Sequence, residues 1–474
     1  MLETSPIHPI PSKLMDLKKL DELYALYKFQ TLPTSHNAFR AYAHTNKYFA
    51  NADIVILDPR QIKDLENVRQ EVAELGYSTN IRVYRTLEDA EDKLFTGFFD
   101  PVNTKKTLQT FYKNYTEKVS KIIFGQYQYI PGTYITEEGD VQNDNLIDTI
   151  VTNFSSNGPL LMVIEAAAGF GKTSAAYEVL NELVLQNESN KIPLFTELSR
   201  NRQASIFKYV LYDEINHKFS GMNLELINRH IITGRIPLII DGFDELLKSS
   251  KDGTKVDIFK DAEPMLQTIS ELLSGNAKIL LTTRKTAIFT DEEFSTWVSK
   301  NTENFACKIY SIGLPQIREW IDASREKSLT RVGLNIKSIS NPVLLSYIKS
   351  MTDEEFQNSL ANIDTLIENY LKLLMEREMT RQDLRMTVEE QEEILEEISN
   401  HFVECDITSE TKSSLEGIIK NQKQRLLIDI LKRYTSDQRI TLDCKLPLKL
   451  GHGQLEFSGF SNILSTKRLS SIFE

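Results

Sequence analysis

Short apolar runs that alternate with helical patterns occupy the centre of this chain and constrain its fold more than any other feature. The runs include PLLMVIEA, KIPLFTEL, RIPLIID and AKILLTT, and patterns such as TSAAYEVLNELVLQ and PMLQTISELL lie between them. β-Branched runs of this length, separated by helices, indicate a parallel sheet with crossover helices. We therefore expect an α/β fold in the centre of the chain.

The first of these runs leads into EAAAGFGKTS, which has the pattern of a phosphate-binding loop. Such a loop follows a buried strand and opens a helix, so that backbone N–H groups, the helix N-terminus and a lysine face the phosphates. Here Lys172 would reach the β- and γ-phosphates, and the Thr173 hydroxyl would bind Mg²⁺. The predicted cofactor-binding loop consists of Ala166, Ala167, Ala168, Gly169, Phe170, Gly171, Lys172, Thr173 and Ser174.

Ala166 stands where the consensus has glycine, at the point where the loop leaves the strand. A small residue can fill that position if its φ stays negative. A tight strand-to-helix turn with a solvent-facing lysine is the simpler alternative for the whole stretch. The strand before it and the helix after it favour the phosphate loop.

Polar residues also end two later runs. Asp241 would lie at the C-terminal tip of a buried strand, where a carboxylate can hold Mg²⁺ through water. Asp244 and Glu245 add acids able to orient or deprotonate an attacking water. Arg284, just beyond LLTT, could sense the γ-phosphate or stabilise developing charge there. We predict Lys172, Asp244, Glu245 and Arg284 as catalytic and Thr173 and Asp241 as metal-binding; a solvated acidic turn and a surface arginine are the alternatives.

The bulk composition narrows the class of protein. Acidic residues outnumber basic ones, 67 to 55, so the net charge of −12 does not support nucleic-acid binding. The three cysteines, Cys307, Cys405 and Cys444, are far apart and form no CxxC pair, which fits a reducing cytosol better than zinc or disulfide frameworks. No apolar run approaches the ~18 residues of a membrane span, and the start lacks a signal-peptide pattern. We expect a cytoplasmic protein.

The flanking regions differ from the centre. ADIVILDP and NIRVYRT suit strands, RQIKDLENVRQEVAELG and LEDAEDKLF suit helices, and the turn-forming, acidic stretch 129–145 suits a boundary. Beyond residue 313 the patterns are helical, and ITLDCKLPLKLGHGQLEFSGF alternates around a glycine-rich turn like a hairpin. The predicted domains are an N-terminal α/β domain (1–125), a linker (126–154), the nucleotide-binding core (155–312), a helical subdomain (313–378) and a winged-helix-like region (379–474).

Together the motifs resemble the NACHT family of signal-transducing P-loop ATPases, the STAND branch related to AAA+ proteins. LIIDGFDEL has the family's hydrophobic strand, Asp, small residue, hydrophobic residue and Asp-Glu, and AAAGFGKTS is similar to its Walker A loop apart from Ala166. LLTTR looks like the sensor strand, and NPVLL places Pro342 where the family's proline contacts the adenine or closes over the nucleotide. The resemblance covers roughly residues 155–380 and implies a P-loop NTPase core of ASCE or AAA+ type, then helical and winged-helix regions.

The resemblance implies a molecular switch that binds ATP or ADP with Mg²⁺. ADP would hold the helical region closed; exchange for ATP would open the protein, which would form a homo-oligomer and control an effector, and slow hydrolysis would reset it. In prokaryotes such proteins commonly serve antiviral (anti-phage) defence, so a phage component is one candidate trigger. One departure is Gly459, which stands where many members have a histidine at the nucleotide; His452 is no assured replacement. The usual C-terminal sensor repeats are also absent from the sequence, as in a short or truncated member.

Two alternatives remain open at this stage. The first is a nucleic-acid enzyme, either a helicase-like motor or an ATPase-controlled nuclease with Asp53 or Asp58 and Glu91-Asp92-Lys93 as metal ligands. That match is loose, because the Glu-Asp-Lys run lies in a helical pattern rather than on a strand. The second is a scaffold that uses ATP only as a structural ligand, against which Asp244 and Glu245 argue mildly.

Overall fold

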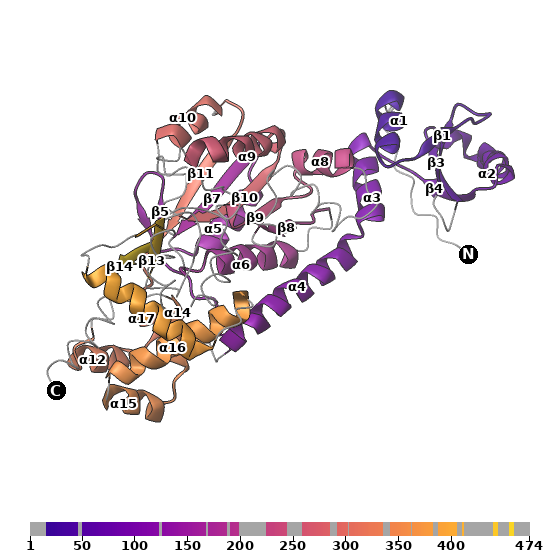
Figure 1. Ribbon diagram of the computed structural model, residues 1–474. Coiled ribbons are helices and arrows are strands. Elements are labelled where there is room, and N and C mark those ends of the chain that lie inside the picture. The colour runs from indigo at the N-terminus through magenta and orange to yellow at the C-terminus, as the bar shows by residue number, and fades with distance from the viewer. Residues whose placement is uncertain are drawn as a thin grey trace. The chain divides into compact units, whose positions relative to one another are not determined.

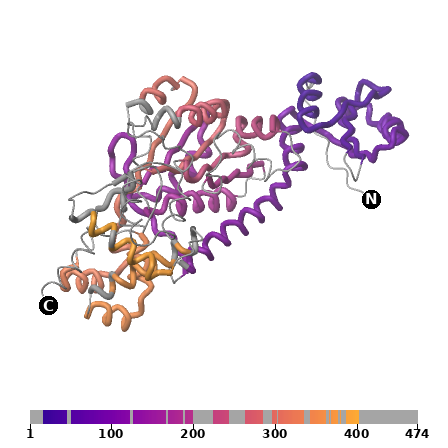
Figure 2. The backbone as a smooth tube through the Cα atoms, in the orientation of Figure 1, coloured from indigo at the N-terminus to yellow at the C-terminus, as the bar shows by residue number. Residues whose placement is uncertain are grey.

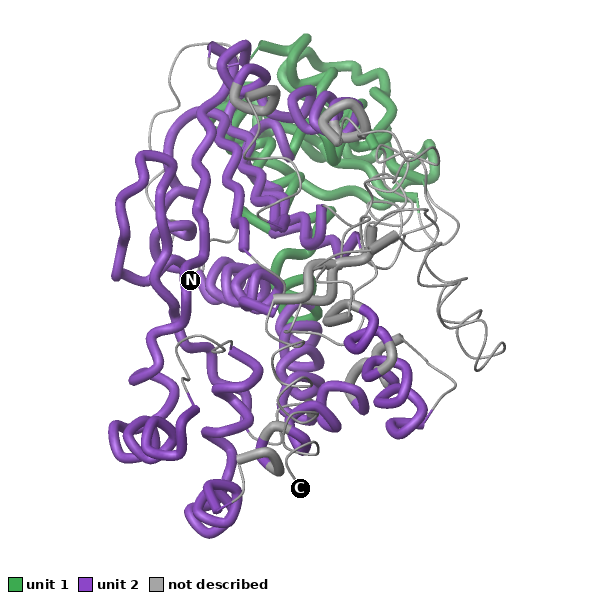
Figure 3. Tube along the Cα trace, turned by 60° about the vertical axis from the view of Figure 1, so that its left-hand side comes forward, with its two compact units in different colours: residues 1–107, 187–192, 215–230 green, residues 108–186, 193–214, 231–474 purple. Residues whose placement is uncertain are grey.

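The computed structural model shows two compact units, which are coloured separately in Figure 3. Unit 1 comprises residues 1–107, 187–192 and 215–230, and unit 2 comprises 108–186, 193–214 and 231–474. Figures 1 and 2 trace the chain, with uncertain residues in grey. The structure describes residues 16–45, 50–122, 126–166, 169–186, 190–198, 224–243, 258–284, 292–301, 303–334, 342–361, 363–382, 387–404, 410–411, 439–443 and 455–458.

Unit 1 is built on a four-stranded sheet in the order β1-β2-β3-β4, in which only the β3–β4 pair is parallel. Alternate residues of β2 and β3, among them Phe39 and Ile54, pack against Val68 and Val72 of α2. Tyr24 of α1 stacks on Tyr42 of β2 on the opposite side of the strands, with ring centroids 3.8 Å apart. Its elements are α1 (Leu17–Leu26), β1 (Gln30–Leu32), β2 (Phe39–Thr45), β3 (Ala50–Ile56), the 3₁₀ helix η1 (Pro59–Asp64), α2 (Leu65–Glu74), β4 (Ser78–Arg82), α3 (Leu87–Phe99) and the start of α4 (Pro101–Ile122).

A segment from far along the sequence completes unit 1. Most of α8 (Leu224–Ile232) belongs to it, and the buried His230 ends that portion. Its Nε2 lies 2.7 Å from the Tyr27 hydroxyl, and its ring meets Phe95 of α3 edge-on. In the sequence, this segment falls between two strands of the central core. Unit 1 is therefore not formed by the N-terminal part of the chain alone.

Unit 2 contains a seven-stranded sheet in the order β6-β5-β11-β7-β10-β9-β8. The strands β11, β7, β10, β9 and β8 run parallel, and β5 and β6 extend the sheet antiparallel. The expected runs form parallel strands with α6 packed on β7, β9 and β10, so the predicted α/β core is confirmed. The sheet and its helices are β5 (Tyr134–Thr136), β6 (Val141–Gln142), α5 (Leu146–Phe154), β7 (Leu160–Ala166), α6 (Lys172–Leu185), β8 (Leu194–Glu197), β9 (Leu238–Asp241), α9 (Ile258–Leu272), β10 (Lys278–Arg284), α10 (Glu292–Asn301) and β11 (Ala306–Ile312).

The stretch expected as a linker, residues 126–154, carries folded structure in unit 2. β5 pairs with β11 between Tyr134 and Ile312, and α5 begins at an Asn145 cap whose side chain accepts from the Ile147 N–H. Five apolar side chains of α5 are buried, including those of Ile150 and Phe154. These strands therefore widen the central sheet, whereas the other domain boundaries stay predictions.

Helices follow β11, as the sequence predicts. Their shared core includes Ile317, Leu345, Leu366 and Leu374. The Arg325 guanidinium donates to the carbonyl of Ile348, in the last turn of α14, at 2.8 Å, and to the carbonyl of Met351, just after that helix, at 2.9 Å. The helices are α11 (Ile317–Trp320), α12 (Ala323–Arg331), α14 (Pro342–Ser350), α15 (Asp353–Ala361), α16 (Ile363–Gln382) and α17 (Val388–Glu404).

The C-terminal region departs from the predicted hairpin. β13 (Arg439–Asp443) pairs with β14 (Leu455–Ser458) in parallel, with a register shift, and β12 (Glu410–Thr411) pairs with β13 antiparallel. Strands joined by a hairpin are antiparallel, so that prediction is wrong for this pair. The glycine-rich turn with His452, and Gly459, lie outside the described residues. Within the described part of the chain, no helix is both long and apolar enough to span a membrane.

Candidate nucleotide site

The loop after β7 has the backbone of a phosphate-binding turn. Ala166 is the last residue of β7, is fully buried and keeps a negative φ, so alanine fits where the consensus has glycine. Gly169 and Gly171 have φ values of 79° and 86°, a conformation that favours glycine. Gly171 caps α6, whose first-turn N–H groups have no partner within the helix and face the loop. Ala167 and Ala168 lie outside the described residues.

Lys172, the first residue of α6, directs its side chain back over this loop. Its Nζ donates to the Ala166 carbonyl at 2.8 Å, and the residue is partly buried. The ammonium therefore sits at the loop entrance rather than pointing into solvent, which was the simpler alternative for this stretch. A cation held there suits the recognition of phosphate oxygens.

A buried aspartate connects the loop to two neighbouring strands. Thr173 Oγ1 donates to Asp241 Oδ2 at 2.9 Å, and Thr282 Oγ1 donates to Asp241 Oδ1 at 2.5 Å. The Thr282 hydroxyl also accepts from the Gly242 N–H at 2.9 Å. Asp241, the last residue of β9, is only 7% exposed. Its carboxylate therefore lies buried at the base of the loop.

These oxygen atoms suit a magnesium ion. Mg²⁺ prefers carboxylate, hydroxyl and water oxygens and binds through one or two protein side chains plus phosphates. Thr173 and Asp241, the two residues predicted as metal-binding, are brought within hydrogen-bonding distance of each other. The part played by Thr282 was missed, although the polar end of an otherwise apolar strand was its signal.

The remaining predicted catalytic residues divide into two groups. Arg284 is the last residue of β10, and its Cα is in register with Ala166, which places it beside the start of the loop. Thr283, one residue earlier, is fully buried. Asp244 and Glu245 lie outside the described residues.

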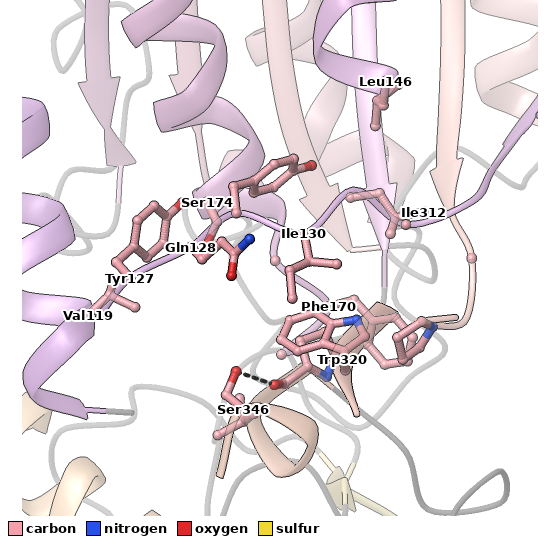
Figure 4. Close-up of a pocket in the computed structure, with 18 residues that line it drawn as sticks. Val119, Tyr127, Gln128, Ile130, Leu146, Phe170, Ser174, Ile312, Trp320 and Ser346 are labelled. Atoms are coloured by element: carbon pink, nitrogen blue, oxygen red, sulfur yellow. Dashed lines mark hydrogen bonds between the residues drawn. The ribbon is translucent and has the colours of Figure 1, made fainter. Parts of the chain in front are cut away.

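A cavity of about 140 Å³ adjoins the loop (Figure 4). The walls come from α4, the segment before β5, the start of α5, the loop and the first turn of α6, the end of β11 and the residues after it, and the helices α11 and α14. The lining residues are Val119, Tyr127, Gln128, Tyr129, Ile130, Gly132, Leu146, Gly169, Phe170, Gly171, Ser174, Ile312, Gly313, Pro315, Trp320, Pro342, Val343 and Ser346.

Most of this lining is apolar or aromatic, with few polar side chains. Gln128 accepts a hydrogen bond from Lys349 of α14 at 3.1 Å, and the Ser346 hydroxyl donates to the Pro342 carbonyl at 2.7 Å, as the dashed line in Figure 4 shows. Pro342, predicted from NPVLL, lies in the wall. Tyr127 and Trp320 were not predicted as site residues.

The residues of the nuclease alternative do not form a metal site. Asp53 on β3 is 3% exposed, and its carboxylate accepts from Arg82 Nε at 3.1 Å and Asn80 Nδ2 at 3.3 Å. Asp58 pairs with the neighbouring Arg60, and Glu91 with Arg229, both ion pairs within unit 1. Among the residues the structure describes, no three acidic, histidine or cysteine side chains group to hold a metal. Arg82 forms an ion pair with the Asp53 carboxylate, the group that a metal cation would need as a ligand.

Comparisons with known proteins bear mainly on the N-terminal part. The family model for NACHT-associated inactive Restriction Endonuclease 2 matches residues 19–137, a minor part of the chain. No significant match exists among curated proteins.

Among solved structures, similar chains include origin and initiator proteins, each at 12% identity. The Aeropyrum pernix ORC2 protein in ADPNP–ADP complexes covers 69% of this chain and 94% of that chain (TM-score 0.27). AMPPCP-bound DnaA from Aquifex aeolicus covers 69% and 86% (TM-score 0.24), and Drosophila ORC bound to DNA covers 68% and 85% (TM-score 0.28). TM-scores this low do not establish a shared overall fold, and we infer no ligand from these proteins.

Proposed function

We propose that this chain is a NACHT-type, ATP-binding signalling switch with slow ATPase activity. The observation that carries the proposal is the hydrogen-bonded series Thr173–Asp241–Thr282 at the base of a glycine turn that opens α6. In this proposal the glycine turn would bind phosphate, Lys172 would supply a positive charge, and Thr173 and Asp241 would supply an oxygen pair for magnesium. All of them lie at the carboxyl ends of parallel strands, where ligands of open α/β sheets bind.

The adjoining cavity supports an adenine nucleotide as the ligand. Phosphates in the loop would leave the base and ribose in the apolar space between Tyr127, Phe170 and Trp320, all of which line it. Helices α11 and α14 supply part of that wall. A bound nucleotide would therefore contact both the sheet and the helical region, and its γ-phosphate could change how the helices close over the sheet.

Each predicted residue has a role in this proposal. Lys172 would bind the β- and γ-phosphates, and Thr173 and Asp241 would hold Mg²⁺, which when bound supplies positive charge that offsets the phosphate charge. Arg284 would sense or stabilise the γ-phosphate. Asp244 and Glu245 would orient the attacking water, and Pro342 would close over the base.

The remaining parts of the proposal follow from the resemblance to the NACHT family. ADP-to-ATP exchange would permit homo-oligomerisation and control of an effector, in response to a trigger such as a phage component, in cytoplasmic antiviral defence. The match to an inactive endonuclease family suggests that the N-terminal unit acts by binding rather than by cleavage. The Asp53–Arg82 ion pair supports the same view.

Nucleotide analysis and particle size test this proposal together. Purified wild-type protein should carry ADP or ATP by mass spectrometry, and should grow in size when ADP is replaced by a non-hydrolysable ATP analogue. Lys172→Ala should lose the nucleotide and the size change, whereas Lys300→Ala, an exposed lysine of α10, should keep both. Wild-type protein that keeps one size in both nucleotides contradicts the switch, and protein that binds neither contradicts the nucleotide site.

A further inference from the structure

One face of α6 is covered by tyrosines from the preceding segment. Ser174, Tyr177 and Glu178 share this face, because residues three and four apart are neighbours on a helix surface. Ser174 directly follows Thr173 and also lines the nucleotide cavity. Contacts that fix this face therefore also fix the first turn of α6, the helix that begins at the phosphate-binding loop.

Three tyrosines from the preceding segment contact this face, and all belong to unit 2. The hydroxyl of Tyr115 on α4 lies 2.7 Å from Ser174 Oγ, and its ring stacks on Tyr177 with centroids 3.8 Å apart and planes 6° apart. The hydroxyls of Tyr112 and Tyr127 both donate to Glu178 Oε1, at 2.8 and 2.7 Å.

The chemistry of these contacts makes them directional. Burial first, and then nearby carboxylates, raises the pKa of Tyr115 above its ordinary value, so its hydroxyl stays protonated at neutral pH. A serine hydroxyl both donates and accepts, so the Tyr115 contact fixes how Ser174 presents its oxygen. Tyr127 meets the cavity itself, so the same tyrosine group touches both the loop helix and the base wall.

We propose that Tyr115 is a positioning residue of the nucleotide site, which holds Ser174 and the first turn of α6 in the geometry that binds phosphate. The role rests on the proposed nucleotide function. Its consequence is that nucleotide binding, which fixes Ser174, also stabilises residues 108–122 of α4, the part of that helix that belongs to unit 2.

A purely structural clamp would give the same contacts, and Tyr112 provides the matched comparison. It is a tyrosine of the same helix whose hydroxyl also binds α6, but its partner is Glu178 rather than the cavity-lining Ser174, and Glu178 keeps Tyr127 after substitution. If the contacts only stabilise the fold, Tyr112→Phe and Tyr115→Phe should behave alike in every nucleotide measurement.

The test is a double-mutant cycle on the dissociation constant for ADP with Mg²⁺, with thermal unfolding measured in parallel. Tyr115→Phe and Ser174→Ala should each weaken ADP about 3- to 10-fold, the span of one lost hydrogen bond. The double variant should be no weaker than the worse single variant, which is the sign of coupling. Tyr112→Phe should stay within about 2-fold of wild type, since its contact lies away from the loop.

Hydrogen–deuterium exchange gives the second readout. ADP should slow amide exchange in residues 108–122 of wild type and of Tyr112→Phe, and should leave that segment unprotected in Tyr115→Phe. Additive losses in the cycle, or an unchanged ADP affinity for Tyr115→Phe, would overturn the inference while wild-type binding upholds the proposed function. Wild-type protein that binds no nucleotide would overturn both.

Discussion

Replacement of Thr282 by valine isolates the contacts that fix Asp241 at the base of the loop. The Thr282 side chain is fully buried on β10. Its hydroxyl donates to the Asp241 carboxylate at 2.5 Å and accepts from the Gly242 N–H at 2.9 Å. Valine has nearly the same shape but can make neither contact, so the change removes two hydrogen bonds without leaving a large cavity.

The two lost contacts set the size of the effect. A hydrogen bond to a charged group contributes about 1.5–3 kcal/mol, and a buried N–H left without a partner costs about 1–3 kcal/mol. Because Asp241 keeps its bond from Thr173, we expect the lower part of the combined range. Thr282→Val should reduce the free energy of unfolding by about 2.5–4 kcal/mol.

The next residue supplies an internal control. Thr283 is also fully buried on β10, yet its hydroxyl has no hydrogen-bond partner among the residues that the structure describes. Thr283→Val replaces that unpaired polar atom with a methyl group, so stability should stay within about 0.5 kcal/mol of wild type or increase. The pair thus compares adjacent threonines that differ in hydrogen bonding rather than in burial.

Urea unfolding of the nucleotide-free protein at neutral pH, followed by circular dichroism, measures both variants. The transition assigned to unit 2 should shift to lower urea for Thr282→Val and hold or rise for Thr283→Val. Equal losses in the two variants, or an unshifted Thr282→Val, would show that the Asp241 contacts do not carry the stability assigned to them.

Two further predictions concern other parts of the chain. Burial raises the pKa of Tyr84 to about 12 from 10.0, so its stability contribution is complete below pH 10 and is lost as the pH rises toward 12. Between pH 10 and pH 12, the free energy of unfolding of Tyr84→Phe should therefore fall by up to about 2.7 kcal/mol less than that of wild type. Equal losses of unfolding free energy in the two proteins over this pH range would contradict the prediction. Arg325 donates to the carbonyls of Ile348 and Met351. Arg325→Ala should cost about 2–3 kcal/mol in thermal unfolding, whereas the exposed Arg318→Ala should cost little; similar losses would argue against the carbonyl contacts.

The core and the loop could be predicted because their signals are local. β7, β9 and β10 are apolar runs that end in polar residues, and the carboxyl ends of parallel strands meet at one sheet edge. That rule predicts that Thr173 and Asp241 lie close together. The partners of Thr282 depend on the register between strands, which a single sequence does not contain.

The cavity wall and the strand pairing at the sheet edge could not be predicted for the same reason. β5 is only three residues long and β6 two, too short to show an alternating pattern, so their segment suggested a linker. Its place beside β11 is a long-range pairing. At the C-terminal end, alternation around a glycine-rich turn favoured a hairpin, but alternation specifies strands and not their relative direction, and β13 and β14 are parallel.

The N-terminal unit shows how a correct element can still mislead. ADIVILDP does form a buried strand, and Asp53 lies on it. Whether that aspartate binds a metal depends on Arg82 of the neighbouring parallel strand, whose guanidinium reaches its carboxylate. His230 likewise joins unit 1 from a distant segment, a placement that no local pattern indicates.

Calorimetric titration of ADP with Mg²⁺ into nucleotide-free protein tests the central claim most directly. We predict one ADP bound per chain for wild type, binding about 100-fold weaker for Lys172→Ala, and wild-type binding for Lys300→Ala. Absence of ADP binding by wild type, or equal binding by Lys172→Ala, would contradict the assignment of this loop and cavity as a nucleotide site.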